Sequence, residues 1–119
     1  MDILILLKNV LSDPEIINLL PDGKVFMLHA DTPNKSLYLE YQVIDEYGEE
    51  YSENEERYTG FIVQVDIFSA GDYVTLSKIV KAKMKEAGFI RDSSADLYEK
   101  DTKLFHKAMR FTISLETEE

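Results

Sequence analysis

The sequence predicts an α+β fold, in which a mainly antiparallel sheet of four to five strands carries helices on one face. Two observations support this fold class. Several segments alternate apolar and polar residues with the two-residue period of a strand, and they follow one another with few helices between them. Two further segments place apolar residues at helical spacing. Strands that are neighbours along the chain favour an antiparallel sheet over a doubly wound parallel one.

The N-terminal residues 1–20 are expected to form two short helices. Asp13 precedes Pro14, which is the usual start of a helix, because an aspartate caps the free N–H groups and proline suits the first helical position. The apolar run at the very start is far shorter than the ~20 residues of a membrane span, so we expect no membrane association. The first helix carries its apolar side chains at Ile3, Leu6, Leu7, Val10 and Leu11.

Three strands are expected next, at residues 25–30, 37–44 and 58–68. Between the second and third lies the acidic segment 45–57, which holds seven acidic residues and one basic residue. We expect a solvated, mobile acidic loop here, because so much like charge opposes burial. Its acids are Asp45, Glu46, Glu49, Glu50, Glu53, Glu55 and Glu56.

The main helix is predicted over residues 72–87. Asp72 is the expected cap, and Gly88 suits the left-handed position that follows a helix. A C-terminal β-hairpin is predicted over residues 89–115, so that residues 1–119 form a single domain. The helix carries one apolar stripe, bordered by Ile79 and made of Tyr73, Leu76, Val80, Met84 and Ala87.

Composition excludes several classes of function. The 119 residues include no cysteine, which removes disulfides, thiolate catalysis and cysteine-ligated metals. The formal net charge of −10 disfavours binding to a phosphate backbone, so no sequence-specific nucleic-acid partner is expected. The chain has no Gly-rich phosphate loop and no G-x-S-x-G motif.

We therefore expect no enzyme, no catalytic residue, no cofactor and no metal. His29 and His106 fall on different predicted strands without metal-ligand spacing, and His106 is interpreted as a residue of the sheet surface. The acidic segment has Glu50 where a calcium-binding EF-hand loop requires glycine. Asp66, alone among apolar neighbours, is interpreted as part of the solvated strand face.

A basic strip on the main helix is less ordinary. Lys78, Lys81 and Lys85 lie within about 60° of one another, opposite the apolar stripe, at 100° per residue. One interpretation is simply a soluble, exposed face. The other is head-to-tail assembly, in which this strip meets the acidic segment of a neighbouring copy.

Two segments of the second half resemble the tail-completion proteins of siphophages and prophages, also called tail terminators. Residues 61–89, FIVQVDIFSAGDYVTLSKIVKAKMKEAGF, are similar to their strand–helix core. Residues 98–111, YEKDTKLFHKAMRF, are similar to their closing hairpin. The resemblance covers roughly residues 25–115. The hairpin motif consists of Tyr98, Glu99, Asp101, Thr102, Phe105, His106, Lys107, Arg110 and Phe111.

The resemblance implies a structural virion protein. Members of that family form a ring, usually a hexamer, that caps the tail tube and joins it to the head. The expected partners are further copies of the chain, a tail tube protein and a head–tail connector protein. The expected place is the virion tail, assembled in the cytoplasm of a bacterial host. The family carries no active site.

An alternative function is a small acidic inhibitor, such as a DNA mimic or a toxin-neutralising immunity protein. The charge of −10 motivates this alternative, since clustered carboxylates can occupy a basic nucleic-acid site. The placement of charge weakens it, because a mimic should spread its acids at phosphate-like intervals. Here the acids concentrate in residues 45–57 and near the C-terminus, while the main helix is basic.

Overall fold

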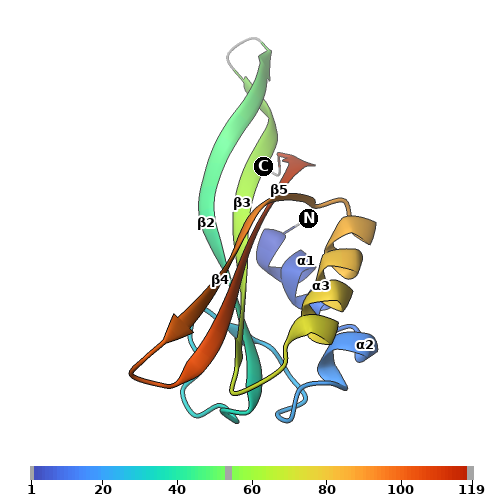
Figure 1. Ribbon diagram of the computed structural model, residues 1–119. Coiled ribbons are helices and arrows are strands. Elements are labelled where there is room, and N and C mark those ends of the chain that lie inside the picture. Colours follow the sequence, from blue (N-terminus) through green and yellow to red (C-terminus); the bar gives the residue numbers. More distant parts are fainter. Residues whose placement is uncertain (1, 53–54, 118–119) are drawn as a thin grey trace.

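A computed structural model describes residues 2–52 and 55–117 of the chain. It has a five-stranded, mostly antiparallel sheet with three helices, which confirms the predicted α+β fold class. All three helices lie on one side of the sheet (Figure 1). In chain order the elements are α1 (Ile3–Leu11), α2 (Pro14–Ile17), β1 (Phe26–Met27), β2 (Leu37–Ser52), β3 (Glu55–Ser69), α3 (Val74–Glu86), β4 (Ile90–Glu99) and β5 (Leu104–Glu116).

The strands lie in the order β1-β2-β3-β5-β4. The short β1 runs parallel to β2, and every other neighbouring pair is antiparallel. Strand β4 therefore forms one edge of the sheet. On the opposite edge β1 pairs only with Glu40 and Tyr41 of β2.

The core lies between the helices and the facing side of the sheet. Apolar side chains of β3 alternate as predicted, with Phe61, Val63, Val65 and Ile67 all buried. On α3 the predicted stripe faces them: Leu76, Val80 and Met84 are buried, and Tyr73, Ile79 and Ala87 pack against the same cluster. We call the opposite side of the sheet the open face.

The two ends of α3 follow from local sequence. At its start the Asp72 carboxylate accepts a hydrogen bond from the Val74 N–H at 2.8 Å, although the cap position itself is Tyr73. At its end Gly88 adopts a φ of 99°, the left-handed conformation that glycine tolerates best. The Phe89 N–H then bonds the Met84 carbonyl, a Schellman arrangement that directs the chain back to the sheet.

The strand predicted over residues 25–30 is much shorter in the structure. Only Phe26 and Met27 belong to β1. Leu28 adopts a φ of 65°, and the His29 N–H bonds the Met27 carbonyl at 2.7 Å. This tight three-residue turn is incompatible with extended backbone, so the strand ends there.

Residues 45–52 and 55–57 of the acidic segment are not a loop in the structure. Residues 45–52 continue β2 and residues 55–57 begin β3, so the two strands form one long hairpin. We call residues 45–52 and 55–59 the hairpin extension; it projects beyond the helices (Figure 1). The radius of gyration is 15.3 Å, whereas a compact domain of this length has about 13.5 Å.

Specific contacts explain why these acidic residues form strands. The carboxylate of Glu56 accepts hydrogen bonds from the hydroxyls of Thr59 and Thr117. The carboxylate of Glu49 accepts one from Ser114 on β5. Charge repulsion is thus offset by charge-assisted hydrogen bonds and by the continuous β2–β3 ladder. Glu53 lies outside the described residues.

Candidate assembly interface

A bulge in β2 determines which acids lie on the open face. Before it, Val43 pairs with Val63, and both side chains point to the helices. After it, Asp45 pairs with Ile62, because Ile44 is the extra residue. A bulge of this kind reverses the alternation of the strand. Asp45, Tyr47 and Glu49 consequently lie on the open face, whereas Glu46, opposite the core residue Phe61, points to the helix side.

Tyr47 occupies the centre of this row, which we call the acidic strip (Asp45, Tyr47 and Glu49). Its ring lies over Gly60, the residue opposite it on β3, and a Cβ atom at position 60 would overlap the ring. Glu49 beside it is fixed by the Ser114 hydroxyl. The Tyr47 side chain still has 39% of its surface exposed. The strip therefore presents one partly exposed aromatic ring between two carboxylates.

The lysines of α3 differ in their surroundings. Lys83 contacts the carboxylates of Asp13 at 3.5 Å and Glu15 at 2.5 Å, and so joins α3 to α2. Its pKa is raised, chiefly by the hydrogen bond to Glu15. The three predicted lysines are separate from this cluster. Lys78 and Lys85 are exposed and Lys81 is half-buried.

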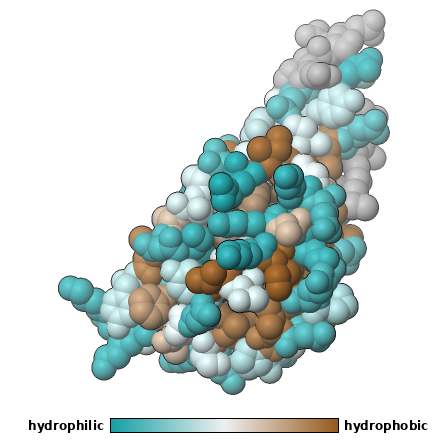
Figure 2. All heavy atoms as spheres, turned by 45° about the vertical axis from the view of Figure 1, so that its right-hand side comes forward, coloured by the Kyte–Doolittle hydropathy of each residue, from teal (hydrophilic) through white to brown (hydrophobic). Residues whose placement is uncertain are grey.

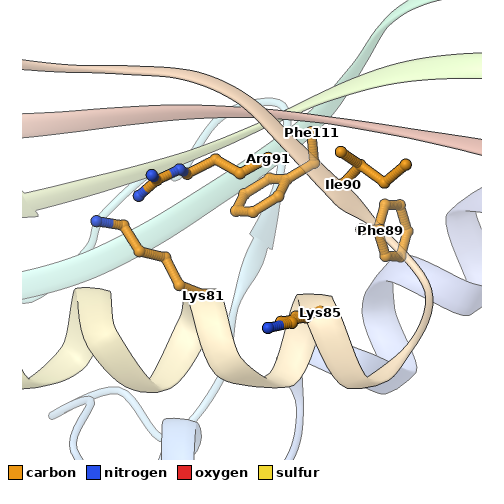
Figure 3. Close-up of a pocket in the computed structure, with 6 residues that line it drawn as sticks. All are labelled: Lys81, Lys85, Phe89, Ile90, Arg91 and Phe111. Carbon is orange, nitrogen blue, oxygen red and sulfur yellow. The ribbon is translucent and has the colours of Figure 1, made fainter.

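Lys81 and Lys85 line a hollow of about 390 Å³ between α3 and the sheet. Arg91, at the start of β4, lies beside Lys81 (Figure 3). Strand β4 also has a bulge, between Arg91 and Ser93, and it leaves Arg91 opposite Phe111. We call this site the basic hollow; its cations are Lys81, Lys85 and Arg91, and its apolar walls are Phe89, Ile90 and Phe111.

Positive charge is concentrated at the basic hollow. The pKa of Lys81 is lowered, first by burial and then by the neighbouring charges of Lys107 and Arg91. Among the side chains that the structure describes, no carboxylate lies within 4.0 Å of any of the three cations of the hollow. Ile90 has 69% of its surface exposed. The hollow thus combines exposed apolar surface with cations that form no ion pair among the described side chains, and the Asp96 carboxylate attracts Lys81 from farther away.

The face of the molecule seen in Figure 2 is otherwise an ordinary protein surface. Hydrophilic side chains cover most of it, and hydrophobic ones appear between them in small groups (Figure 2). Scattered exposed apolar residues of this kind are normal for a protein surface. The basic hollow differs because its apolar walls and its cations are contiguous.

The predicted hairpin motif occupies the end of β4, the following turn and β5. Tyr98 packs against Phe105, with ring centroids 5.1 Å apart. In the turn, which includes Asp101, the Thr102 hydroxyl donates to Glu99 at 3.3 Å. These contacts stabilise the hairpin itself.

His106 and Arg110 of the motif contact Asp66 and Gln64 on β3. Two other residues of the motif lie on the helix side of the hairpin. Lys107 contacts the Asp96 carboxylate, whose pKa is lowered first by the Tyr73 hydroxyl and then by Lys107. Phe111 is buried in the core and also forms a wall of the basic hollow. The motif is therefore mainly structural, and it contributes only Phe111 to the hollow.

Asp66 was interpreted as part of the solvated strand face, and this is wrong. His106 lies half-buried on the open face of the sheet, in agreement with its interpretation as a residue of the sheet surface. Asp66 has only 4% of its surface exposed, and its carboxylate lies 2.7 Å from His106 Nε2. Gln64 donates to the same carboxylate and accepts from Arg110 Nε. The His106 ring stacks on Phe68. A carboxylate buried as deeply as that of Asp66 requires such partners.

The remaining observations concern metals and membranes. Across residues 2–52 and 55–117, no group of three or more histidine, aspartate or glutamate side chains could hold a metal ion. His29 is exposed and lies 3.8 Å from Glu40. In the same part of the chain, no helix has the length and apolar character needed to cross a membrane.

Comparison with known proteins identifies the fold. No family model matches the sequence, and no curated protein sequence matches it. Solved structures do share its architecture: a mostly antiparallel sheet covered by helices on one side. One of them is a chain from the virion of a native gene transfer agent (GTA) particle, with a TM-score of 0.62 and 11% identity. The match covers 92% of this chain and 90% of that one, so the two share a fold over nearly their whole length.

Proposed function

We propose that this chain is a structural subunit of a phage-like particle. The observation that carries the proposal is the shared fold with a chain of a gene transfer agent virion, which extends over 92% of this chain. At 11% identity the likeness concerns the fold, so the function is our inference. The separation of charge on the molecule supports an assembly role, because the acidic strip and the basic hollow lie on different elements.

Within such a particle, we infer the role of a tail terminator or tail-completion subunit. In this role copies of the chain form a ring, usually hexameric in the family that it resembles, which caps the tail tube and contacts the head–tail connector. Two different, complementary surfaces on one chain suit a ring, because a heterologous contact closes when its rotation divides a full turn. The subunit would then reside in the virion tail after assembly in the bacterial cytoplasm.

The alternative of an acidic inhibitor receives less support. The hairpin extension holds the densest acidic run of the chain, and the basic hollow lies on the same molecule. A DNA mimic gains nothing from such a group of cations. Charge complementarity between copies accounts for both surfaces together.

The role can be tested on purified particles from a host that carries the gene. We expect mass spectrometry to find the chain in the particles, and electron microscopy to find it as a ring between tail tube and connector. Deletion of the gene should leave heads and tails unjoined. Particles of normal yield and normal joining without the chain would contradict the role.

A double variant tests the basic face of α3. Lys78→Glu with Lys81→Glu should abolish head–tail joining and leave the fold intact, because Lys78 is exposed and the half-buried Lys81 forms no ion pair among the described side chains. The matched control, Lys35→Glu with Lys100→Glu, makes the same change in total charge away from α3. Normal particle yield from the first variant would exclude the helix face as the joining surface.

A further inference from the structure

The basic hollow has the properties of a binding site for an aromatic side chain flanked by carboxylates. Its apolar walls include Ile90, which has 69% of its surface exposed to solvent. Its cations have no carboxylate within ion-pair distance among the described side chains. At about 390 Å³ the hollow exceeds by far the ~30 Å³ that one water occupies. An occupant should therefore bring both apolar surface and negative charge.

The acidic strip offers this combination. The bulge at Ile44 brings Asp45, Tyr47 and Glu49 to the same face of β2. Successive residues on one face of a strand lie about 6.8 Å apart, so the two carboxylates flank the ring at close range. The ring rests on Gly60 and Glu49 is held by Ser114, so part of the cost of ordering both side chains is already met.

The two surfaces belong to opposite sides of the sheet. Tyr47 lies on the open face, as its contact with Gly60 requires. Phe111 of the hollow points to the helix side, where it is buried with Val63 opposite it on β3. One copy cannot fold its own strip into its own hollow across the sheet. A contact between the two must join different copies head to tail.

We propose that the basic hollow binds Tyr47 of a second copy of this chain. The ring packs against Phe89 and Ile90, and the flanking carboxylates, Asp45 and Glu49, pair with Lys81, Lys85 and Arg91. This contact rests on the proposed assembly of the chain and specifies the surfaces that make it.

Charge argues against the other obvious contact between copies. The free edge of β4 could pair with the free edge of β2 and extend the sheet. However, β4 carries Asp92, Asp96 and Glu99, and the free part of β2 is itself acidic. Like charges on adjacent strands repel one another. The cations of the basic hollow provide the complementary surface instead.

Cysteine cross-linking tests the contact directly, because the chain has no cysteine of its own. Tyr47→Cys and Ile90→Cys place one thiol in each surface and retain all five charged groups of the contact. The two single variants are mixed in low salt, oxidised and separated without reductant. We expect a covalent dimer in the mixture, and little in either variant alone, because a heterologous contact brings position 47 of one copy to position 90 of another.

Two controls make the result decisive. Tyr47→Cys mixed with Val74→Cys, an exposed residue at the start of α3, should give at least tenfold less dimer. High salt should reduce the specific dimer, since exposed charge pairs are screened. Equal yields with positions 90 and 74, or no dimer with position 90, would overturn the proposal. A dimer formed by Tyr47→Cys alone would also overturn it, because that result indicates a symmetric contact.

The outcome is separable from the proposed function. If particles contain the chain and the cross-link does not form, the subunit role stands and this contact is wrong. If the cross-link forms and particles lack the chain, the contact stands and the virion role is wrong.

Discussion

The helix-covered half of the molecule and the hairpin extension hold their charges in different ways. In the first, Lys83 joins α2 to α3 through Asp13 and Glu15, and Lys107 contacts Asp96. In the hairpin extension, Asp45 and Glu46 are exposed, and the carboxylate of Glu49 is bonded to a neutral hydroxyl. Internal ion pairs neutralise the first region outside the basic hollow, whereas the second keeps its negative charge.

This difference separates folding from assembly. The free energy of folding comes mainly from the apolar cluster between the helices and the sheet, since burial is the dominant favourable contribution. The hairpin extension is outside that cluster apart from its junction with the core. Changes in the apolar cluster should therefore unfold the protein, and charge changes in the hairpin extension or the basic hollow should affect contacts between copies.

The largest effect is expected from a core truncation in α1. Leu7 is fully buried, so Leu7→Ala should lower the free energy of unfolding by about 2–5 kcal/mol through lost burial and a residual cavity. Urea unfolding followed by circular dichroism measures it. Ile5 on the same helix has 57% of its surface exposed, and Ile5→Ala should change stability by less than about 0.5 kcal/mol. Equal effects of the two variants would contradict the placement of α1.

A smaller loss is expected from the polar network on the open face. Asp66→Ala leaves His106 and Gln64 without their shared acceptor, which should cost about 1–3 kcal/mol. Asp66→Asn retains an oxygen acceptor and should lose less. Urea unfolding compares the two variants. If Asp66→Ala has the same free energy of unfolding as the parent, the network contributes nothing to stability.

The smallest effect concerns Asp96 and depends on pH. Its folded-state pKa is lowered by the Tyr73 hydroxyl and by Lys107. The stabilisation is therefore complete well above the unfolded-state value near ~3.9 and is lost as the pH falls through the lower folded-state value. Asp96→Asn should be less stable than the parent at pH 7 by under about 1 kcal/mol, because the site is exposed.

This difference should shrink when unfolding is repeated as the pH falls below about 4. Asp92→Asn is the matched control, because it removes one carboxylate from β4 and leaves the Tyr73 and Lys107 contacts in place. A difference for Asp96→Asn that stays constant with pH would contradict the assigned cause.

Local patterns predicted the helix-covered half well. The two-residue period of β3 and the helical stripe of α3 identified the core, and Gly88 marked the end of the helix. These features are local, because each depends on residues within a few positions of one another.

The features that the sequence did not reveal depend on contacts between distant segments. The run of like charge in residues 45–57 suggested a loop. The hydroxyl groups of Ser114 and Thr117, which bond Glu49 and Glu56, lie far along the chain and could not be foreseen. Asp66 and His106 are 40 positions apart. Arg91 joins the basic hollow through a bulge that no composition signal marks. An arginine two positions after Phe89 of the Gly-Phe helix end was the one available hint.

The most direct test of head-to-tail assembly is a charge exchange between two variants, with association measured by sedimentation velocity and native mass spectrometry. Asp45→Lys with Glu49→Lys reverses the acidic strip, and Lys81→Glu with Lys85→Glu reverses the basic hollow. Each variant alone should associate at least about tenfold more weakly than the parent, because its two surfaces now carry charge of the same sign and repel each other. Each variant should keep the thermal stability of the parent. An equimolar mixture should assemble again, since each reversed surface meets its complement. A parent that stays monomeric at all concentrations in low salt, variants that associate as the parent does, or a mixture that stays monomeric would contradict the account.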